Sequence, residues 1–280
     1  LAGRALQGVG ASSPRIVSMA MVRDGQGGAA MARIMSFVMS VFMLVPILAP
    51  SIGQLVLFIA SWRMIFVGFL AMAVIAAIIL QVRQEETLPR EKRVAFSAGN
   101  LFRSAVQFFR FPAAWGYTVS VGFVFASFIC YLGTSQQIFA EQYAQGEWFA
   151  VWFGAFAVAI AFAMIFNGRM VMRHGMRMLA IWAVRGCILL AAVFLPVALA
   201  YAGQPPLWTL GLFLFCTFFC CGILFGNYNA MAMEPVGHIA GMAAAISGTL
   251  STLVALAIGT WFGQQYDGTV MPLAYAFLAM

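Results

Sequence analysis

The sequence predicts an all-α integral membrane protein, and three observations support this prediction. Hydrophobic residues make up 64% of the 280 residues and charged residues only 8%, whereas an average soluble domain carries roughly 25% charged residues. Apolar runs of about 20 residues, the length that crosses a bilayer, recur along the whole chain. The runs lack the two-residue alternation of barrel strands, and backbone groups in lipid must pair within their own segment, so each run is predicted to be a helix.

The apolar runs predict about eight complete transmembrane helices and part of a ninth, which begins near residue 271. The predicted spans cover residues 1–22, 34–60, 64–82, 113–135, 148–167, 178–201, 207–229 and 239–263. Tryptophan side chains prefer helix ends, where the indole ring meets both lipid and water. Five tryptophans occupy such places: Trp62, Trp115, Trp148, Trp208 and Trp261. The first residue is leucine and no signal peptide is visible, so the chain is expected to be a fragment.

Basic residues fall unevenly on the two sides of the predicted membrane. Of the 15 Lys and Arg residues, 11 lie on one set of alternate connectors, only Arg63 lies on the other, and Arg4, Arg15 and Arg185 lie inside spans. Because cytoplasmic loops carry the excess of Lys and Arg, the first helix is predicted to run from outside to inside. Topology therefore explains the net charge of +7, and no nucleic-acid partner is expected.

The connector at residues 83–112 is the longest and most polar in the chain, with the sequence RQEETLPREKRVAFSAGNLFRSAVQFFRFP from Arg83 to Pro112. It is predicted to be a cytoplasmic linker between two helical bundles, at residues 1–82 and 113–280. In its second half, apolar residues oppose polar ones: Phe102, Val106 and Phe109 against Arg103, Gln107 and Arg110. This pattern suits a helix on the anionic inner leaflet, and a solvated tether is the alternative.

The first span carries two arginines on one helical face. Arg4 and Arg15 are 11 positions apart, so they point within about 20° of each other and lie about 16 Å apart along the helix. Gln7 and Gly8 fall close to the same direction. A charge inside the bilayer costs on the order of 3 kcal/mol and usually marks a substrate or ion pathway. Snorkelling to the headgroups is the alternative, but Arg15 lies about 13 Å of helix away from Asp24.

Several stretches resemble the major facilitator superfamily, and most closely its drug:proton antiporters of the Bcr/CflA branch. The resemblance is carried by RALQGVG at a helix start, MVRD at its end, MSVFMLVPILAPSIGQ, SWRMIF and the long basic loop. It implies family helices 4 to 6 at residues 1–82, and family helices 7 to 11 with the start of helix 12 at residues 113–280. It further implies proton-coupled export of drugs or small lipophilic compounds across a bacterial inner membrane, by a transporter that works as a monomer when full length.

The resemblance assigns roles in the first bundle. Arg4 and Gly8 match the R-x-x-x-G motif of family helix 4, whose arginine is associated with proton coupling. Asp24 resembles the acid that pairs with a loop arginine when the inner side closes. A third match is to the antiporter motif G-x-x-x-G-P-x-x-G-G of family helix 5, through Pro46, Pro50 and Gly53. The match is imperfect because Ala49 and Gln54 stand where that motif has glycines.

In the second bundle, the resemblance places a substrate cavity near the bilayer midplane. Its expected polar points are Tyr117 and Tyr131 on family helix 7, and Asn227 and Tyr228 on family helix 10, in a wall rich in Phe and Met. Such walls suit varied lipophilic ligands because Met and Phe repack without strict directionality. The alternative is that these four side chains only pack helix against helix.

Two other functions remain open on the sequence. Arg4 and Arg15 on one face could bind a carboxylate or phosphate, which predicts a carrier of an anionic metabolite with the same fold. The truncated chain could also be inactive. A membrane enzyme is not expected, since no His/Asp/Glu or Cys/His constellation lies within the spans, and neither a metal nor another cofactor is expected. All eight acids lie in connectors or at helix ends, so the coupling acid is expected in helices outside this sequence.

Overall fold

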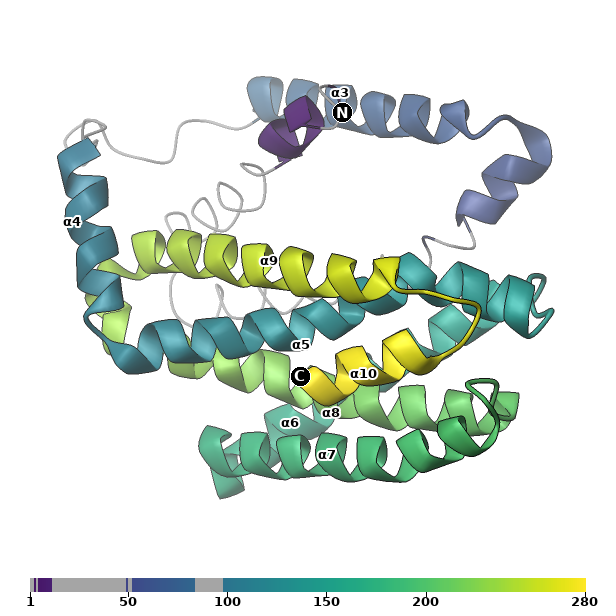
Figure 1. Ribbon diagram of the computed structural model, residues 1–280. Helices are drawn as coiled ribbons and strands as arrows, with labels where there is room; N and C mark the ends of the chain where they lie inside the picture. Colours follow the sequence, from purple (N-terminus) through teal and green to yellow (C-terminus); the bar gives the residue numbers. More distant parts are fainter. Residues whose placement is uncertain (1–2, 4, 12–48, 50–51, 84–97) are drawn as a thin grey trace. The chain divides into compact units, whose positions relative to one another are not determined.

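The computed structural model describes residue 3 and residues 5–11, 49, 52–83 and 98–280. The chain divides into two compact units, Leu1–Phe96 and Ser97–Met280 (Figure 1). Within the described residues all regular secondary structure is helical, with turns between the helices and no strands, and six helices are long and apolar enough to cross a membrane. The chain is therefore an all-α, multi-pass membrane protein, as its composition predicts.

The first unit contains one long described helix, α3 (Arg63–Arg83), which coincides with the predicted span at 64–82. Residues 5–11 and 52–59 are also helical. The Arg63 guanidinium lies 4.8 Å from the ring centroid of Trp62, a cation–π contact at the helix start. Most of the predicted spans at 1–22 and 34–60 lies outside the described residues, as does the first half of the predicted linker.

The second unit is a bundle in which each predicted span coincides with a helix. Its elements are α4 (Ala98–Phe109), α5 (Pro112–Gln136), η2 (Gln137–Gln142), α6 (Phe149–His174), α7 (Met176–Ala200), α8 (Leu207–Met233), η3 (Glu234–Ile239), α9 (Ala240–Gln264) and α10 (Met271–Ala279). The five predicted tryptophan anchors are all exposed, as expected of indole rings at a membrane surface.

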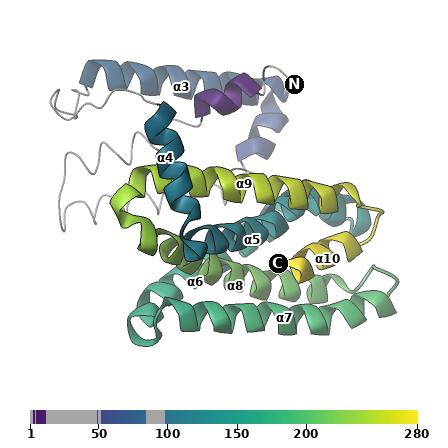
Figure 2. The same cartoon turned by 60° about the vertical axis from the view of Figure 1, so that its left-hand side comes forward.

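Small residues hold α5 and α9 side by side (Figures 1 and 2). A Cβ atom on Gly122 would lie 2.7 Å from the Cβ of Val254, and one on Gly259 would lie 2.5 Å from the carbonyl oxygen of Ala126. Only glycine fits such an approach, which is how membrane helices gain van der Waals contact without a hydrophobic driving force. The hydroxyls of Thr118 and Ser247 add a buried hydrogen bond of 2.8 Å between the two helices.

Aromatic rings fill the core formed by α5, α6, α7, α8 and α10. Phe194 of α7 stacks on Phe213 of α8 with ring centroids 4.1 Å apart and planes 4° from parallel. Phe277 of α10 meets Phe213 edge to face at 5.7 Å. Offset and edge-to-face aromatic pairs contribute about 0.5–1.5 kcal/mol each beyond the area that they bury. Helix α10 is therefore an integral part of the bundle.

A polar clamp closes the end of the bundle at which α5 and α7 finish. Tyr143, which follows the π-helical turn η2, donates its hydroxyl hydrogen to the carbonyl of Pro205 at 2.5 Å. Gln142 donates to the carbonyl of Gly203 at 3.3 Å, and Gly203 has the left-handed φ of +81°. Burial, together with the nearby Tyr266, raises the pKa of Tyr143 from 10.0 to about 12. The phenol therefore remains a hydrogen-bond donor at any physiological pH.

This clamp predicts a pH dependence of stability. Because the pKa of Tyr143 is raised in the folded chain, the neutral phenol stabilises the fold below pH 10, and this contribution is lost as the pH rises from 10.0 to about 12. Thermal unfolding of the detergent-solubilised protein should therefore show a fall in melting temperature over this interval. The fall should be smaller in Tyr143→Phe, and equal falls in both proteins would contradict the assignment.

Candidate functional site

Most of the predicted site residues of the first bundle fall outside the described part of the chain. These are Arg4, Arg15, Asp24, Pro46 and Pro50. Gln7 and Gly8 lie on the described helical stretch 5–11, where both are exposed. Gly53 is half-buried at the start of the helical stretch 52–59. The roles that the family motifs assign to these residues remain predictions.

In the second bundle the structure brings two of the predicted cavity residues together. Tyr117 of α5 and Tyr228 of α8 stack with their ring centroids 5.8 Å apart and their planes 28° from parallel. Both side chains are half-buried, so each ring keeps part of its surface open. Two half-buried phenol rings offer flat apolar faces, whose electron-rich surfaces attract cations, and two hydroxyl groups.

Asn227 directly precedes Tyr228 on α8, and its side chain forms hydrogen bonds to a different helix. Its side chain is 2% exposed, and its Nδ2 donates to Oδ1 of Asn167 on α6 at 2.8 Å. Asn167 returns the bond from its own Nδ2 to Oδ1 of Asn227 at 3.2 Å. Sequence reasoning missed Asn167, although an amide at the end of the apolar run 148–167 was a signal for it. The reciprocal pair satisfies both amides and joins α6 to α8.

Tyr131 is the most buried of the predicted cavity residues, with 1% of its surface exposed. Its ring stacks on Phe153 at 5.8 Å and meets Phe218 edge to face at 5.0 Å. Its hydroxyl has no hydrogen-bond partner within the described structure, and neither does the hydroxyl of the equally buried Thr217. A substrate would reach Tyr131 only if this aromatic cluster opened.

A hollow of about 510 Å³ lies where the ends of α5, α6, α7 and α8 meet. Its wall contains an aromatic ring from Tyr117, a positive charge from Arg177 and a negative charge from Glu234. Three methionines add apolar surface. The full lining is Ala113, Tyr117, His174, Gly175, Met176, Arg177, Met178, Met231, Glu234 and Pro235. This lining suits an amphipathic ligand with a charged or polar group, since few directional contacts accompany much adaptable apolar surface.

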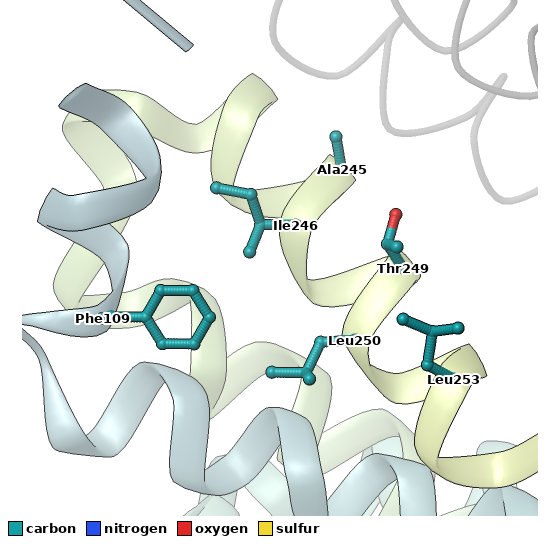
Figure 3. A pocket seen from close by; sticks show the side chains of 6 residues that line it. All are labelled: Phe109, Ala245, Ile246, Thr249, Leu250 and Leu253. Carbon is teal, nitrogen blue, oxygen red and sulfur yellow. The ribbon is translucent and has the colours of Figure 1, made fainter. Parts of the chain in front are cut away.

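A second hollow, of about 370 Å³, lies between Phe109 of α4 and the side of α9. Figure 3 shows Phe109, Ile246 and Leu250 facing the same space, with Thr249 as the one polar side chain among those labelled. The remaining lining residues are Ala245 and Leu253. A wall of this kind has nothing to orient a polar substrate, and it suits an acyl chain or another apolar segment.

The acidic residues and cysteines in the described part of the chain offer no candidate metal site. The four acids there, Glu141, Glu147, Glu234 and Asp267, stand at helix ends or in connectors. The five cysteines are unpaired thiols, and no described group of three or more His, Cys, Asp or Glu residues is placed to hold a metal ion.

Comparisons with a family model and with known proteins agree on one family of membrane transporters. The model described as Major Facilitator Superfamily matches residues 1–260. The MFS-type transporter YdgK of Bacillus subtilis is 28% identical over 277 residues, covering 98% of this chain and 68% of YdgK. The multidrug resistance protein MdtL of Vibrio parahaemolyticus is 27% identical over 271 residues, covering 94% of this chain and 65% of MdtL.

A third relative is a bicyclomycin resistance protein homolog of Haemophilus influenzae, 24% identical over 291 residues that cover 97% of this chain and 68% of the relative. The chain thus spans about two thirds of the length of these curated relatives. The family match over residues 1–260, together with the membrane-spanning helices, leads to one conclusion. The chain belongs to the major facilitator superfamily of membrane transporters.

Proposed function

We propose that this chain is the larger part of a proton-coupled exporter of drugs or small lipophilic compounds, acting by alternating access in a bacterial inner membrane. The observation that supports the substrate class best is the stacked, half-open pair Tyr117 and Tyr228, whose first member also lines the methionine-rich hollow. Aromatic and methionine surfaces accept varied lipophilic and cationic ligands. Two of the relatives are named for multidrug and bicyclomycin resistance, which points to the same class.

Proton coupling needs a titratable acid inside the bundle, tuned by desolvation and by nearby positive charge. We place this acid on a helix of the longer transporter, since the relatives exceed the length of this chain. Arg4 and Arg15, whose spacing in the sequence predicts that they share one helical face, would then hold the acid in its charged form until substrate arrives. Gln7 adds a polar side chain and Gly8 a small one to the same predicted face.

The remaining motif residues fit an alternating-access cycle. We propose that Pro46 and Pro50, each of which lacks a backbone donor, bend the helix that the sequence predicts for them, and that Gly53 permits close packing next to this bend. We propose that this segment seals one side of the bundle and that Asp24 latches the inner side when it closes. The partners of the transporter are then its substrate, protons and the lipid bilayer, with no nucleic acid, and the working unit is the full-length monomer.

The test uses the full-length transporter in everted vesicles with an acid interior. Addition of several unrelated neutral or cationic drugs should release protons from the vesicles, and simple organic anions should not. Arg4→Ala should abolish this drug-driven proton flux while the protein remains in the membrane. Arg169→Ala removes one positive charge as well, from an exposed position on α6, and serves as the control. A normal drug-driven proton flux in Arg4→Ala would contradict the role proposed for Arg4.

A carrier of an anionic metabolite is the second candidate, and Arg177 with His174 in the wall of the larger hollow favours it. Guanidinium groups bind carboxylates and phosphates through paired hydrogen bonds. In the same vesicles, proton release with one organic anion and none with drugs would select this function. Arg4 and Arg15 would then be substrate ligands.

The tyrosine pair supplies a further prediction for the exporter. Tyr228→Ala should raise the KM for a cationic drug roughly fivefold, since a cation–π or stacking contact is worth about 1 kcal/mol, and should leave kcat largely unchanged. Tyr228→Phe should keep most of the affinity because the ring remains. Tyr275→Ala, at an exposed position on α10, is the matched control. An unchanged KM in Tyr228→Ala would remove the pair from the substrate site.

A further inference from the structure

Helix α4 lies across the ends of α5 and α9 instead of alongside them (Figures 1 and 2). Because α5 and α9 cross the membrane, a helix laid across their ends runs along the membrane surface. The same end of the bundle carries five of the arginines of this unit: Arg103, Arg110, Arg169, Arg173 and Arg177. The opposite end carries acids and no Lys or Arg among the residues described in this unit. By the positive-inside rule, α4 lies on the cytoplasmic face.

One side of α4 fixes the helix to the bundle. Phe108 is fully buried and packs with Ala114 at the start of α5, Val236 in η3 and Ala243 in α9. Phe108 also meets the ring of Phe109 edge to face at 5.5 Å. Such a buried anchor holds the rotation of α4 about its own axis, so its other sides face fixed directions.

A second side of α4 presents large apolar groups outward. Phe102 is 73% exposed, Phe109 51% and Val106 39%. At 100° per residue these three lie within about 60° of one another, and Phe108 lies about 100° beyond Phe109. The exposed apolar side is therefore separate from the side that packs on the bundle. In water, this much aromatic surface would be unfavourable, at about 25 cal/mol for each Å².

A third side of α4 is basic. Arg103 and Arg110 are seven residues apart, so they point within about 20° of each other, and they follow Val106 by about 40–60° around the helix. Both are exposed, and the described structure contains no ion pair for either guanidinium. An apolar side that borders a basic side is the arrangement of a helix at the boundary between acyl chains and anionic headgroups.

We propose that α4 is an interfacial anchor that binds anionic phospholipid of the inner leaflet. Phe102, Val106 and Phe109 enter the acyl-chain boundary, while Arg103 and Arg110 bind headgroup phosphates. The hollow beside Phe109, walled by Ile246 and Leu250, offers an apolar place for an acyl chain of the bound lipid (Figure 3). This inference holds for whichever substrate the transporter carries.

The test places a nitroxide label on the full-length transporter in nanodiscs. Single cysteines at position 102 or 103, in a background with the native cysteines replaced, report the apolar and the basic side of α4, both of which are exposed. Label accessibility is measured to oxygen, which concentrates in lipid, and to a water-soluble nickel complex. A label at 102 should be oxygen-accessible and shielded from nickel, and a label at 103 should show the reverse. A label at Gln204, in an exposed connector, is the aqueous reference.

The arginines are tested by lipid composition. Discs with phosphatidylglycerol should shield the label at 102 more than discs of phosphatidylcholine alone. Arg103→Gln with Arg110→Gln should weaken this preference roughly fivefold for each arginine, a charge near the surface being worth about 1 kcal/mol. Arg169→Gln with Arg173→Gln removes the same charge from the same face and should leave the preference unchanged. Native mass spectrometry of bound phosphatidylglycerol, with the native cysteines in place, repeats the comparison without a label.

Three results would overturn the proposal. Free access of nickel to position 102 would make the segment a solvated tether. Shielding of position 102 from both oxygen and nickel would mean that another part of the protein covers this side. Equal lipid preference in the two double variants would show that Arg103 and Arg110 do not bind headgroups.

Discussion

Replacing Gly259 by leucine should drive α5 and α9 apart and leave little correctly folded protein in the membrane. A Cβ atom at this position would lie 2.5 Å from the carbonyl oxygen of Ala126 and 2.8 Å from the Cβ of Ile129. Neither neighbour is the mobile end of a long side chain, so the contact is relieved only by moving a helix backbone. Overpacking of a core typically costs about 1–3 kcal/mol, and a clash with backbone belongs at the upper end of that range or above it.

The measurement is size-exclusion chromatography and thermal unfolding of the detergent-solubilised protein. Gly248→Leu is the matched control, because Gly248 lies on the same helix and its Cβ position has open space around it in the described structure. Gly259→Leu should lose most of the monodisperse peak, and Gly248→Leu should keep it. Equal peaks and equal melting temperatures for the two variants would show that α5 and α9 do not depend on this close approach.

The long elements of the fold were predictable because apolar length is a strong signal, but their ends were not. The predicted span 148–167 became the helix Phe149–His174, which continues for seven residues through the polar stretch after Asn167. Hydropathy locates the part of a helix inside lipid, whereas this helix ends at Gly175, whose φ of +75° suits glycine. The turn η2 after α5 was likewise invisible to hydropathy.

The candidate site was predictable only in part, since a sequence shows which residues lie in a span but not how deeply each is covered. Tyr117 and Tyr131 are 14 positions apart and point within about 40° of each other on α5. The first is half-buried beside Tyr228, and the second is enclosed by rings of α6 and α8. The difference arises from the aromatic side chains of α6 and α8 that pack around Tyr131, which no pattern within α5 itself reveals.

The amide pair Asn167 and Asn227 should be worth more to stability than an average hydrogen bond between membrane helices. Such bonds average about 0.6 kcal/mol in double-mutant cycles, because the unpaired groups often find other partners. Here two bonds join the same two side chains, and Asn227 is 2% exposed. Its amide has little access to another partner, so the cost of leaving it unpaired approaches the 1–3 kcal/mol of a buried polar group.

The burial of the two amides predicts an order among the variants. Asn167→Leu strands the enclosed amide of Asn227 and should lower the free energy of unfolding by about 1–3 kcal/mol. Asn227→Leu leaves Asn167, which is only half-buried and can turn toward other partners, so it should cost less. The double variant places two apolar side chains where the amides met and should be more stable than Asn167→Leu, since replacing both partners of a buried hydrogen bond is often nearly neutral.

Urea or thermal unfolding of the three variants beside the parent protein measures this cycle, and the sign of the coupling decides the interpretation. If the two substitutions simply add, the amides act independently and their hydrogen bonds contribute little. If the double variant recovers stability but loses transport, the pair has a second role in addition to holding α6 against α8. Asn227 directly precedes Tyr228 on α8, so we would then expect the amides to act in the movement of α6 and α8 during the transport cycle, because an amide can form a hydrogen bond to substrate or water and a leucine cannot.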